Sequence, residues 1–159
     1  MTQENLTVNK SLKVSKKEIL DDFLLMNVSR NISYIGRKEV FMGRAKFGVF
    51  GDGKELPQIA MSKFFRNGDF RSGYYRDQTF MMSINQLTPD QFFAQLYAHT
   101  DIKKDPHSGG RQMNCHFGTR LLNENGDWKT QTDMMNSVSD ISCVSGQMPR
   151  IVGLAYASK

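Results

Sequence analysis

The segment from residue 101 to residue 140 limits most strongly what this chain can fold into. It is polar and rich in turn-forming residues, including Gly109-Gly110 and Asn125-Gly126. Loops longer than about 15 residues without regular structure are uncommon in compact domains and are usually functional. We therefore expect 101–140 to be mostly loop beside a site, and the rest of the 159-residue chain to build the core.

The composition is sufficient for one domain with a hydrophobic core. Hydrophobic residues make up 39% of the chain, and a chain of about 150 residues buries roughly 70% of its extended surface. The longest apolar stretch, Ile151–Ala157, has seven residues, far fewer than the ~18 that a membrane span needs. Two cysteines, Cys115 and Cys143, are too few for a disulfide framework. This favours a reducing, cytoplasmic location without a membrane partner.

Capping signals and apolar spacing predict several helices and one short strand. Ser15 and Glu18 form a capping box ahead of a helix over Lys16–Ser33. Its expected buried stripe is Ile19, Leu20, Phe23, Leu24 and Val28. The other expected elements are an irregular stretch over 36–53, a helix over 54–65, a strand over Phe70–Tyr75, a helix capped by Thr88 with buried face Phe92, Phe93, Leu96 and Tyr97, and a final helix from Gln147 with apolar face Ile151, Val152, Ala155 and Tyr156. The chain ends about two turns into this last helix, so we expect it to be part of a longer protein.

Three groups of residues invite a chemical interpretation that their surroundings do not support. Gly51-Asp52-Gly53 lacks the following Lys and Ser/Thr of a phosphate-binding loop, so a turn is preferred. His99, His107 and His116 lack the spacing of a zinc site, and only His116 lies in a loop of functional character. Cys143 has no evident activating base and is interpreted as a packing residue.

Residues 64–76 alternate aromatic side chains with arginines. The members are Phe64, Phe65, Arg66, Phe70, Arg71, Tyr74, Tyr75 and Arg76. Aromatic rings could stack bases while arginines bind phosphates, as in single-strand nucleic-acid binders, and the net charge of +5 is compatible with this. Alternatively, Tyr75 and Arg76 could present a strand end to a small phosphorylated ligand. In a purely structural interpretation the phenylalanines are core and the arginines are surface.

Three motifs occur in order and together are more specific than any one of them. They are Ser72–Asp77, Gly109–His116 and Ile141–Pro149. From about Leu20 to the end, the chain resembles the N-terminal part of the α subunit of thiamine diphosphate-dependent 2-oxo acid dehydrogenases, especially the branched-chain type. The resemblance implies an α/β chain: the N-terminal portion of a thiamine diphosphate-binding fold, with N-terminal helices and a long cofactor-side loop. Residues 1–15 would be a flexible N-terminus and 16–159 an incomplete binding domain.

The resemblance also implies which residues meet the cofactor. Tyr75 and Arg76 would contact the diphosphate, and Ser142 and Val144 would line the aminopyrimidine. Further candidates for the surrounding loops are Arg111, His116 and Gln147. The potassium loop of branched-chain relatives is altered here by Ile141, Cys143 and Gly146, so no potassium site is expected.

The family's magnesium–diphosphate motif, a Gly-Asp-Gly followed by an asparagine, has no counterpart in this sequence, because Gly51-Asp52-Gly53 lies upstream of Tyr75. Magnesium is therefore expected only in an intact enzyme, and this chain alone is expected to bind the cofactor weakly or not at all and to be inactive. The intact enzyme would oxidatively decarboxylate a 2-oxo acid and pass the acyl group to a lipoyl domain. Implied partners are a β subunit or fused β half and a dihydrolipoyl acyltransferase core. The alternatives are a nucleic-acid-binding module over 64–76 and a non-enzymatic scaffold derived from the family.

Overall fold

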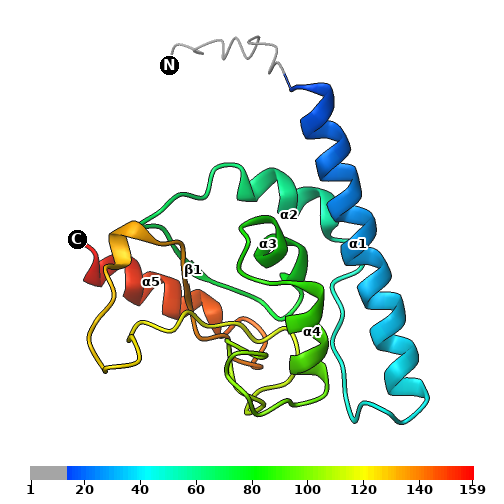
Figure 1. Cartoon of the computed structure of the whole chain (residues 1–159). Helices are drawn as coiled ribbons and strands as arrows, with labels where there is room; N and C mark the ends of the chain where they lie inside the picture. The colour runs from blue at the N-terminus through cyan, green and yellow to red at the C-terminus, as the bar shows by residue number, and fades with distance from the viewer. Residues whose placement is uncertain (1–13) are drawn as a thin grey trace.

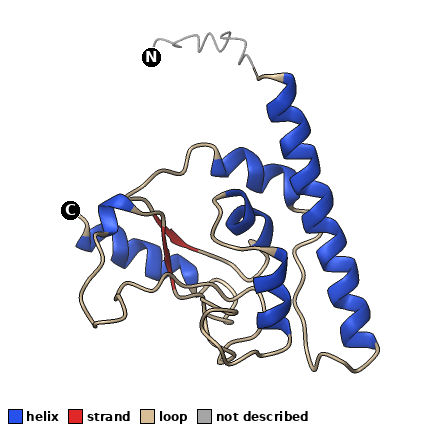
Figure 2. Cartoon of the chain, viewed as in Figure 1, coloured by secondary structure: helices blue, strands red, loops and turns tan. Residues whose placement is uncertain are grey.

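The computed structural model describes residues 14–159, so most of the predicted flexible N-terminus lies outside it. The described chain is rich in helix and contains a small parallel sheet (Figures 1 and 2). Its elements are α1 (Lys16–Phe41), α2 (Glu55–Ser62), β1 (Phe70–Ser72), α3 (Gln78–Ser83), α4 (Pro89–Leu96), the 3-10 helix η1 (Gln131–Asp133), β2 (Asn136–Val138) and α5 (Gln147–Ala157). Phe70 lies opposite Asn136 in the sheet. This architecture is compatible with the predicted α/β class.

Helix α1 begins where predicted but does not end at Ser33. It continues to Phe41 and is about 39 Å long. Gly36 does not interrupt it, because a single interior glycine costs only about 1 kcal/mol. A Cβ at Gly36 would lie 2.4 Å from the Phe50 ring, so the glycine gives this ring room against the helix. The expected irregular segment 36–53 is therefore helical in its first part.

The predicted buried stripe of α1 is wrong for its first turns. Ile19, Leu20, Phe23 and Leu24 are 56–63% exposed, whereas the buried residues lie further along, from Ser29 to Glu39. In Figure 1 the first turns of α1 extend beyond α2 and the other elements. Apolar spacing reports a face that can be buried, but it does not report whether another element of the chain reaches that face.

The predicted capping box at α1 is only half formed. Ser15 Oγ accepts a hydrogen bond from the Glu18 amide at 3.1 Å. The Glu18 carboxylate lies instead 2.6 Å from Lys63 Nζ, just beyond α2. In α4, by contrast, the Thr88 cap forms the full reciprocal pair with Gln91, as predicted, and Phe92 is completely buried.

The centre of the core is α3, which the sequence did not reveal. Its residues Gln78 to Met82 are all buried, and α3 packs against both α1 and α2. Phe80 meets the ring of Phe65 edge-on at 5.2 Å. A six-residue helix buried on all sides shows no amphipathic pattern, which explains why periodicity misses it.

The other element boundaries are shorter than expected. Helix α2 ends at Ser62 rather than Phe65, and β1 ends at Ser72 rather than Tyr75. Segment 101–140 is mostly turns and loop, but it also contains η1 and β2. Helix α5 starts at Gln147 as predicted, but it has no buried residue within the described chain, and Tyr156 is 83% exposed. None of the helices in residues 14–159 has the length and apolarity to cross a membrane.

Candidate functional site

The turn between β1 and α3 carries Tyr75 and Arg76. Asp77 closes it by accepting a hydrogen bond from the Tyr74 amide at 2.8 Å, while the Asp77 amide donates to the Tyr74 carbonyl at 3.0 Å. Gln58 of α2 donates to the Arg76 carbonyl at 2.9 Å. The backbone at Tyr75 and Arg76 is therefore fixed from both sides.

Predicted site residues from distant parts of the chain meet at one cavity of about 220 Å³. Its lining residues are Phe47, Val49, Tyr75, Arg76, Met113, His116 and Ser142. Tyr75 and Arg76 come from the turn after β1, His116 from the loop before residue 120, and Ser142 from the loop before α5. Three of the four residues predicted to contact the cofactor thus share a cavity with His116, although their roles stay predictions.

The apolar wall of the cavity is held by Asn114. Asn114 Oδ1 accepts from the Val49 amide at 2.9 Å, and its Nδ2 donates to the Val49 carbonyl at 2.6 Å. This pair of bonds ties the segment with Phe47 and Val49 to the His116 loop. Asn114 is 1% exposed, and sequence reasoning gave it no role of its own.

Gly51 allows the segment before α2 to approach the site closely. A Cβ at this position would lie 2.4 Å from the Arg76 carbonyl oxygen, so no larger residue fits without backbone movement. Asp52 forms an ion pair with Arg37 at 2.7 Å. The Lys54 amide donates to the Gly51 carbonyl at 3.2 Å and α2 follows directly, so the preferred interpretation of Gly51-Asp52-Gly53 as a turn that leads into a helix is confirmed.

The electrostatic character of the cavity comes from Arg76 and two neighbouring tyrosines, whose rings are tilted by 33° to each other. The Tyr74 and Tyr75 rings lie 4.0 Å apart, and the Arg76 guanidinium lies 5.4 Å from the Tyr75 ring centre. The Tyr74 hydroxyl donates to the Tyr75 oxygen at 2.6 Å, and this bond raises the pKa of Tyr74. Tyr75 keeps its own proton free to donate. Within residues 14–159 Arg76 has no ion-pair partner, so the cavity offers a cation and a hydroxyl donor to an anion.

Arg71 is not available to an external ligand. Its side chain is 6% exposed and its Nη2 lies 2.9 Å from both Asp77 Oδ2 and Asp140 Oδ2. Phe64, in contrast, is 74% exposed. The nucleic-acid interpretation required Arg71 to bind phosphate, and the structural interpretation required the phenylalanines inside and the arginines outside. The nucleic-acid interpretation is wrong at Arg71, and the structural interpretation is wrong at both Arg71 and Phe64. Arg71 lies in the interior because it pairs with buried carboxylates there.

His116 links two of the loops that form the cavity. It is 3% exposed, its Nε2 lies 2.9 Å from Ser142 Oγ and its Nδ1 lies 3.2 Å from the Asn114 carbonyl. Its ring stacks nearly parallel to that of Tyr75 at 6.4 Å. Cys115 beside it has a φ of 60°, a left-handed conformation that is uncommon for a non-glycine residue and turns the chain sharply before His116.

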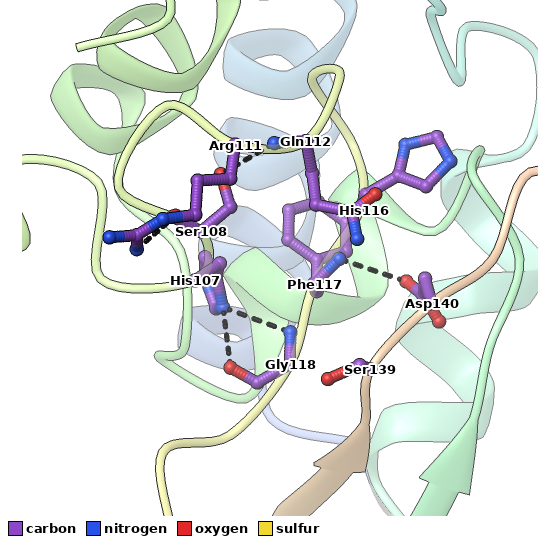
Figure 3. Close-up of a pocket in the computed structure, with 9 residues that line it drawn as sticks. All are labelled: His107, Ser108, Arg111, Gln112, His116, Phe117, Gly118, Ser139 and Asp140. Carbon is purple, nitrogen blue, oxygen red and sulfur yellow. Dashed lines mark hydrogen bonds between the residues drawn. The ribbon is translucent and has the colours of Figure 1, made fainter. Parts of the chain in front are cut away.

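Arg111 faces a different cavity on the other side of the His116 loop. This second cavity, of about 200 Å³, is lined by His107, Ser108, Arg111, Gln112, His116, Phe117, Gly118, Ser139 and Asp140 (Figure 3). In Figure 3 the His116 ring points away from Arg111 and His107. Arg111 is therefore not brought together with Tyr75 and Arg76.

The remaining candidates lie at the surface near the start of α5. Val144 is 71% exposed and does not line the first cavity. Gln147 accepts a hydrogen bond from Ser72 Oγ through its carbonyl at 3.2 Å, which anchors α5 to β1. Cys143 is exposed, so its interpretation as a packing residue is wrong. Among the described residues, no group of three or more His, Cys, Asp or Glu side chains could hold a metal ion.

His107 gives the fold a pH dependence that can be measured. Burial lowers its pKa below the ordinary 6.5, while its Nε2–H donates to the Gln86 carbonyl at 2.8 Å. The His107 imidazole is therefore harder to protonate in the folded state than in the unfolded chain. The contribution of His107 to stability is present above pH 6.5 and is lost as the pH falls through its lowered pKa.

We expect His107→Gln to flatten the pH dependence of the free energy of unfolding on the acid side of neutrality. Urea unfolding between about pH 5 and pH 8 measures this slope. His99→Gln, at an exposed position after α4, is the matched control and should keep the wild-type slope. An unchanged slope in His107→Gln would contradict the assignment.

The helix-rich α/β fold and its cavity define a domain suited to hold an anionic ligand between a strand end and two loops. The family model described as "Dehydrogenase E1 component" matches residues 25–157, and the chain belongs to this family. It is 26% identical over 152 residues to the protein named 2-oxoisovalerate dehydrogenase subunit alpha of Bacillus subtilis (strain 168). The match covers 95% of this chain and 41% of that relative, so the chain spans less than half the relative's length. The predicted resemblance to the α subunit of a 2-oxo acid dehydrogenase is confirmed, and neither comparison supports nucleic-acid binding.

Proposed function

We propose that this chain forms part of the cofactor site of a 2-oxo acid dehydrogenase E1 component and holds the diphosphate end of thiamine diphosphate. The observation that carries the proposal is the convergence of Tyr75, Arg76 and Ser142 on one cavity. A guanidinium without an ion-pair partner in residues 14–159 and a free tyrosine proton suit a phosphate group. The chemistry of the residues therefore fits the group.

The size of the cavity supports a shared site. Pockets that enclose a drug-sized ligand measure about 300–1,000 Å³, whereas this cavity measures about 220 Å³. It can enclose only part of the cofactor. In our proposal the remainder is covered by other polypeptide, such as a β subunit or fused β half, and the exposed Val144 reaches the aminopyrimidine only in that assembly.

Each residue has a distinct task in this proposal. Arg76 neutralises the diphosphate, and Tyr75 donates a hydrogen bond to it. Phe47 and Met113 exclude water from the part of the cavity that they line. The bound cofactor supplies the carbanion that reacts with a 2-oxo acid. The described residues offer no cluster for magnesium, so we derive no role for this ion within them.

The substrate and the remaining partners are proposed from the family, and the cytoplasmic location from the cysteine content, rather than from the cavity. We propose a branched-chain 2-oxo acid as substrate, because the relative is named for 2-oxoisovalerate. Transfer of the acyl group to a dihydrolipoyl acyltransferase core in the cytoplasm belongs to the same proposal.

Replacing Arg76 tests the proposal. We expect thiamine diphosphate to bind wild-type protein weakly, with a Kd of about 1 mM, and to shift the NMR signals of Tyr75, Arg76 and Ser142 in a saturable way. Arg76→Ala should weaken binding by about tenfold or more, because a hydrogen bond to a charged group contributes about 1.5–3 kcal/mol. NMR titration measures both.

Arg66→Ala is the matched control, since Arg66 is an exposed arginine of the same aromatic–arginine segment outside the cavity. Equal loss of affinity in both variants would indicate non-specific attraction of an anion. Saturable shifts elsewhere in the chain, with none at Tyr75 or Arg76, would contradict the proposal.

A further inference from the structure

The hydrogen bonds of His116 define which ring nitrogen carries its proton. Nδ1 lies 3.2 Å from the Asn114 carbonyl oxygen, which can only accept, so Nδ1 must be the donor. In a neutral imidazole the other nitrogen, Nε2, is then an acceptor. With the ring neutral, the Ser142 hydroxyl, 2.9 Å away, donates its hydrogen bond to Nε2.

This arrangement decides what Ser142 can offer to a ligand. A serine hydroxyl has one proton and two lone pairs. Because the hydroxyl proton is engaged in the hydrogen bond to His116, only the two lone pairs remain available. Ser142 can therefore accept a hydrogen bond in the cavity but cannot donate one. His116 is buried at 3% exposure, and its ring stacks on the Tyr75 ring. Burial and stacking together hold the imidazole in one orientation.

We propose that His116 is a positioning residue that sets the polarity of Ser142, so that the ligand group beside Ser142 is a hydrogen-bond donor such as a ring amino group. The cavity then has a donor-rich end at Arg76 and Tyr75, an apolar wall at Phe47, and an acceptor at Ser142. These lining residues suit a ligand that places an anion beside Arg76 and an amine beside Ser142, while the rest of the ligand lies outside this cavity. This inference rests on the proposed function, for which thiamine diphosphate is such a ligand.

A pair of ligands that differ in one group tests the inference. In oxythiamine diphosphate a carbonyl oxygen replaces the amino group of the pyrimidine. We expect wild-type protein to bind thiamine diphosphate about fivefold more tightly than the oxo analogue, because two acceptors would face each other. NMR titration of the whole chain with each ligand gives the ratio of the two affinities.

Three substitutions separate the direct contact of Ser142 with the ligand from the positioning of Ser142 by His116. Ser142→Ala should remove the preference for the amino ligand, whereas Ser142→Thr keeps a hydroxyl and should retain it. His116→Phe keeps an aromatic ring against Tyr75 but removes the acceptor, so the freed Ser142 hydroxyl can turn and donate to the oxo analogue. We expect the preference to fall toward unity in this variant, a change that lost packing alone would not produce.

The outcomes for the two proposals are distinguishable. Equal affinities for both ligands in wild-type protein, or a full preference in His116→Phe, would overturn the role of His116 while leaving cofactor binding intact. Binding of neither ligand would refute the proposed function instead. The tautomer is then tested without a ligand, by long-range ¹H–¹⁵N NMR in mildly alkaline buffer, where an Nε2-protonated His116 would overturn the inference.

Discussion

Replacing Arg71 with methionine should lower the free energy of unfolding by about 3–5 kcal/mol, the usual cost of removing one partner from a buried ion pair. Arg71 Nη2 lies 2.9 Å from Asp77 Oδ2 and Asp140 Oδ2, and its Nη1 donates to Ser137 Oγ at 2.6 Å. The Asp140 side chain is fully buried, so the variant leaves it charged without compensation. Domains are stable by about 5–15 kcal/mol in total, so a large part of this stability would be lost.

The methylene stem of methionine preserves much of the volume of arginine, so the effect reports charge and hydrogen bonding more than packing. Arg71→Lys keeps the charge but loses the planar guanidinium and its several N–H donors. We expect it to lower the free energy of unfolding by an intermediate amount. Urea unfolding followed by circular dichroism measures all three proteins. Arg66→Met, at an exposed position, should change stability by less than about 0.5 kcal/mol. If Arg71→Met changed the free energy of unfolding as little as Arg66→Met, the buried ion pair would not stabilise the fold.

The second large effect is expected at Gln78, which joins three parts of the chain in the core. Its Oε1 accepts from the Gly51 amide at 3.1 Å, and its Nε2 donates to the Ser29 carbonyl and to Ser33 Oγ, each at 2.9 Å. Gln78 is 0% exposed. Leucine has a similar size but no polar atoms. In Gln78→Leu the buried Gly51 amide loses its acceptor, and each unsatisfied buried group costs about 1–3 kcal/mol.

We expect Gln78→Leu to destabilise the protein by about 3 kcal/mol, which corresponds to a fall in Tm of roughly 6–12 °C for a domain of this size. Thermal unfolding by circular dichroism measures it. Gln112→Leu is the control, because Gln112 is exposed and its side chain makes no hydrogen bond within residues 14–159. Gly51 lies beside the Arg76 carbonyl, where a Cβ would come within 2.4 Å of the oxygen. Gln78→Leu should therefore also weaken thiamine diphosphate binding at temperatures where the variant is folded. A Tm within 2 °C of wild type, below what 1 kcal/mol would cause, would contradict the role of Gln78.

Local signals in the sequence predicted several elements correctly. The starts of α1, α4 and α5 lie where their signals are, and the Thr88 cap has its full reciprocal geometry. The order of the motifs around Tyr75, His116 and Ser142 likewise pointed to residues that share a cavity. The helix α3 and the strand β2 were missed, because short buried elements have no periodicity to detect. The extent of α1 was missed because the interior Gly36 does not end the helix.

Burial was the property that sequence reasoning predicted least well. Phe23 and Leu24 had the spacing of a core face and are exposed, whereas Arg71 and Asn114 are polar and are buried. Asn114 lies within a recognised motif, but nothing in its neighbours shows that its side chain will hydrogen-bond to the backbone of Val49, a residue 65 positions away. No sequence signal of this chain alone would have found that contact.

By itself the sequence determined where α1, α4 and α5 begin and which residues carry the E1 family motifs, because caps and motifs depend on groups within a few positions of one another. The tertiary structure decided which of the arginines in 64–76 lines the cavity. Arg76 lines the cavity, whereas Arg71 is bound to Asp140, 69 residues further along the chain. The physical reason is that a charge enters the interior only where the fold supplies its counter-charge, and that partner is known only once the distant segments have been brought together.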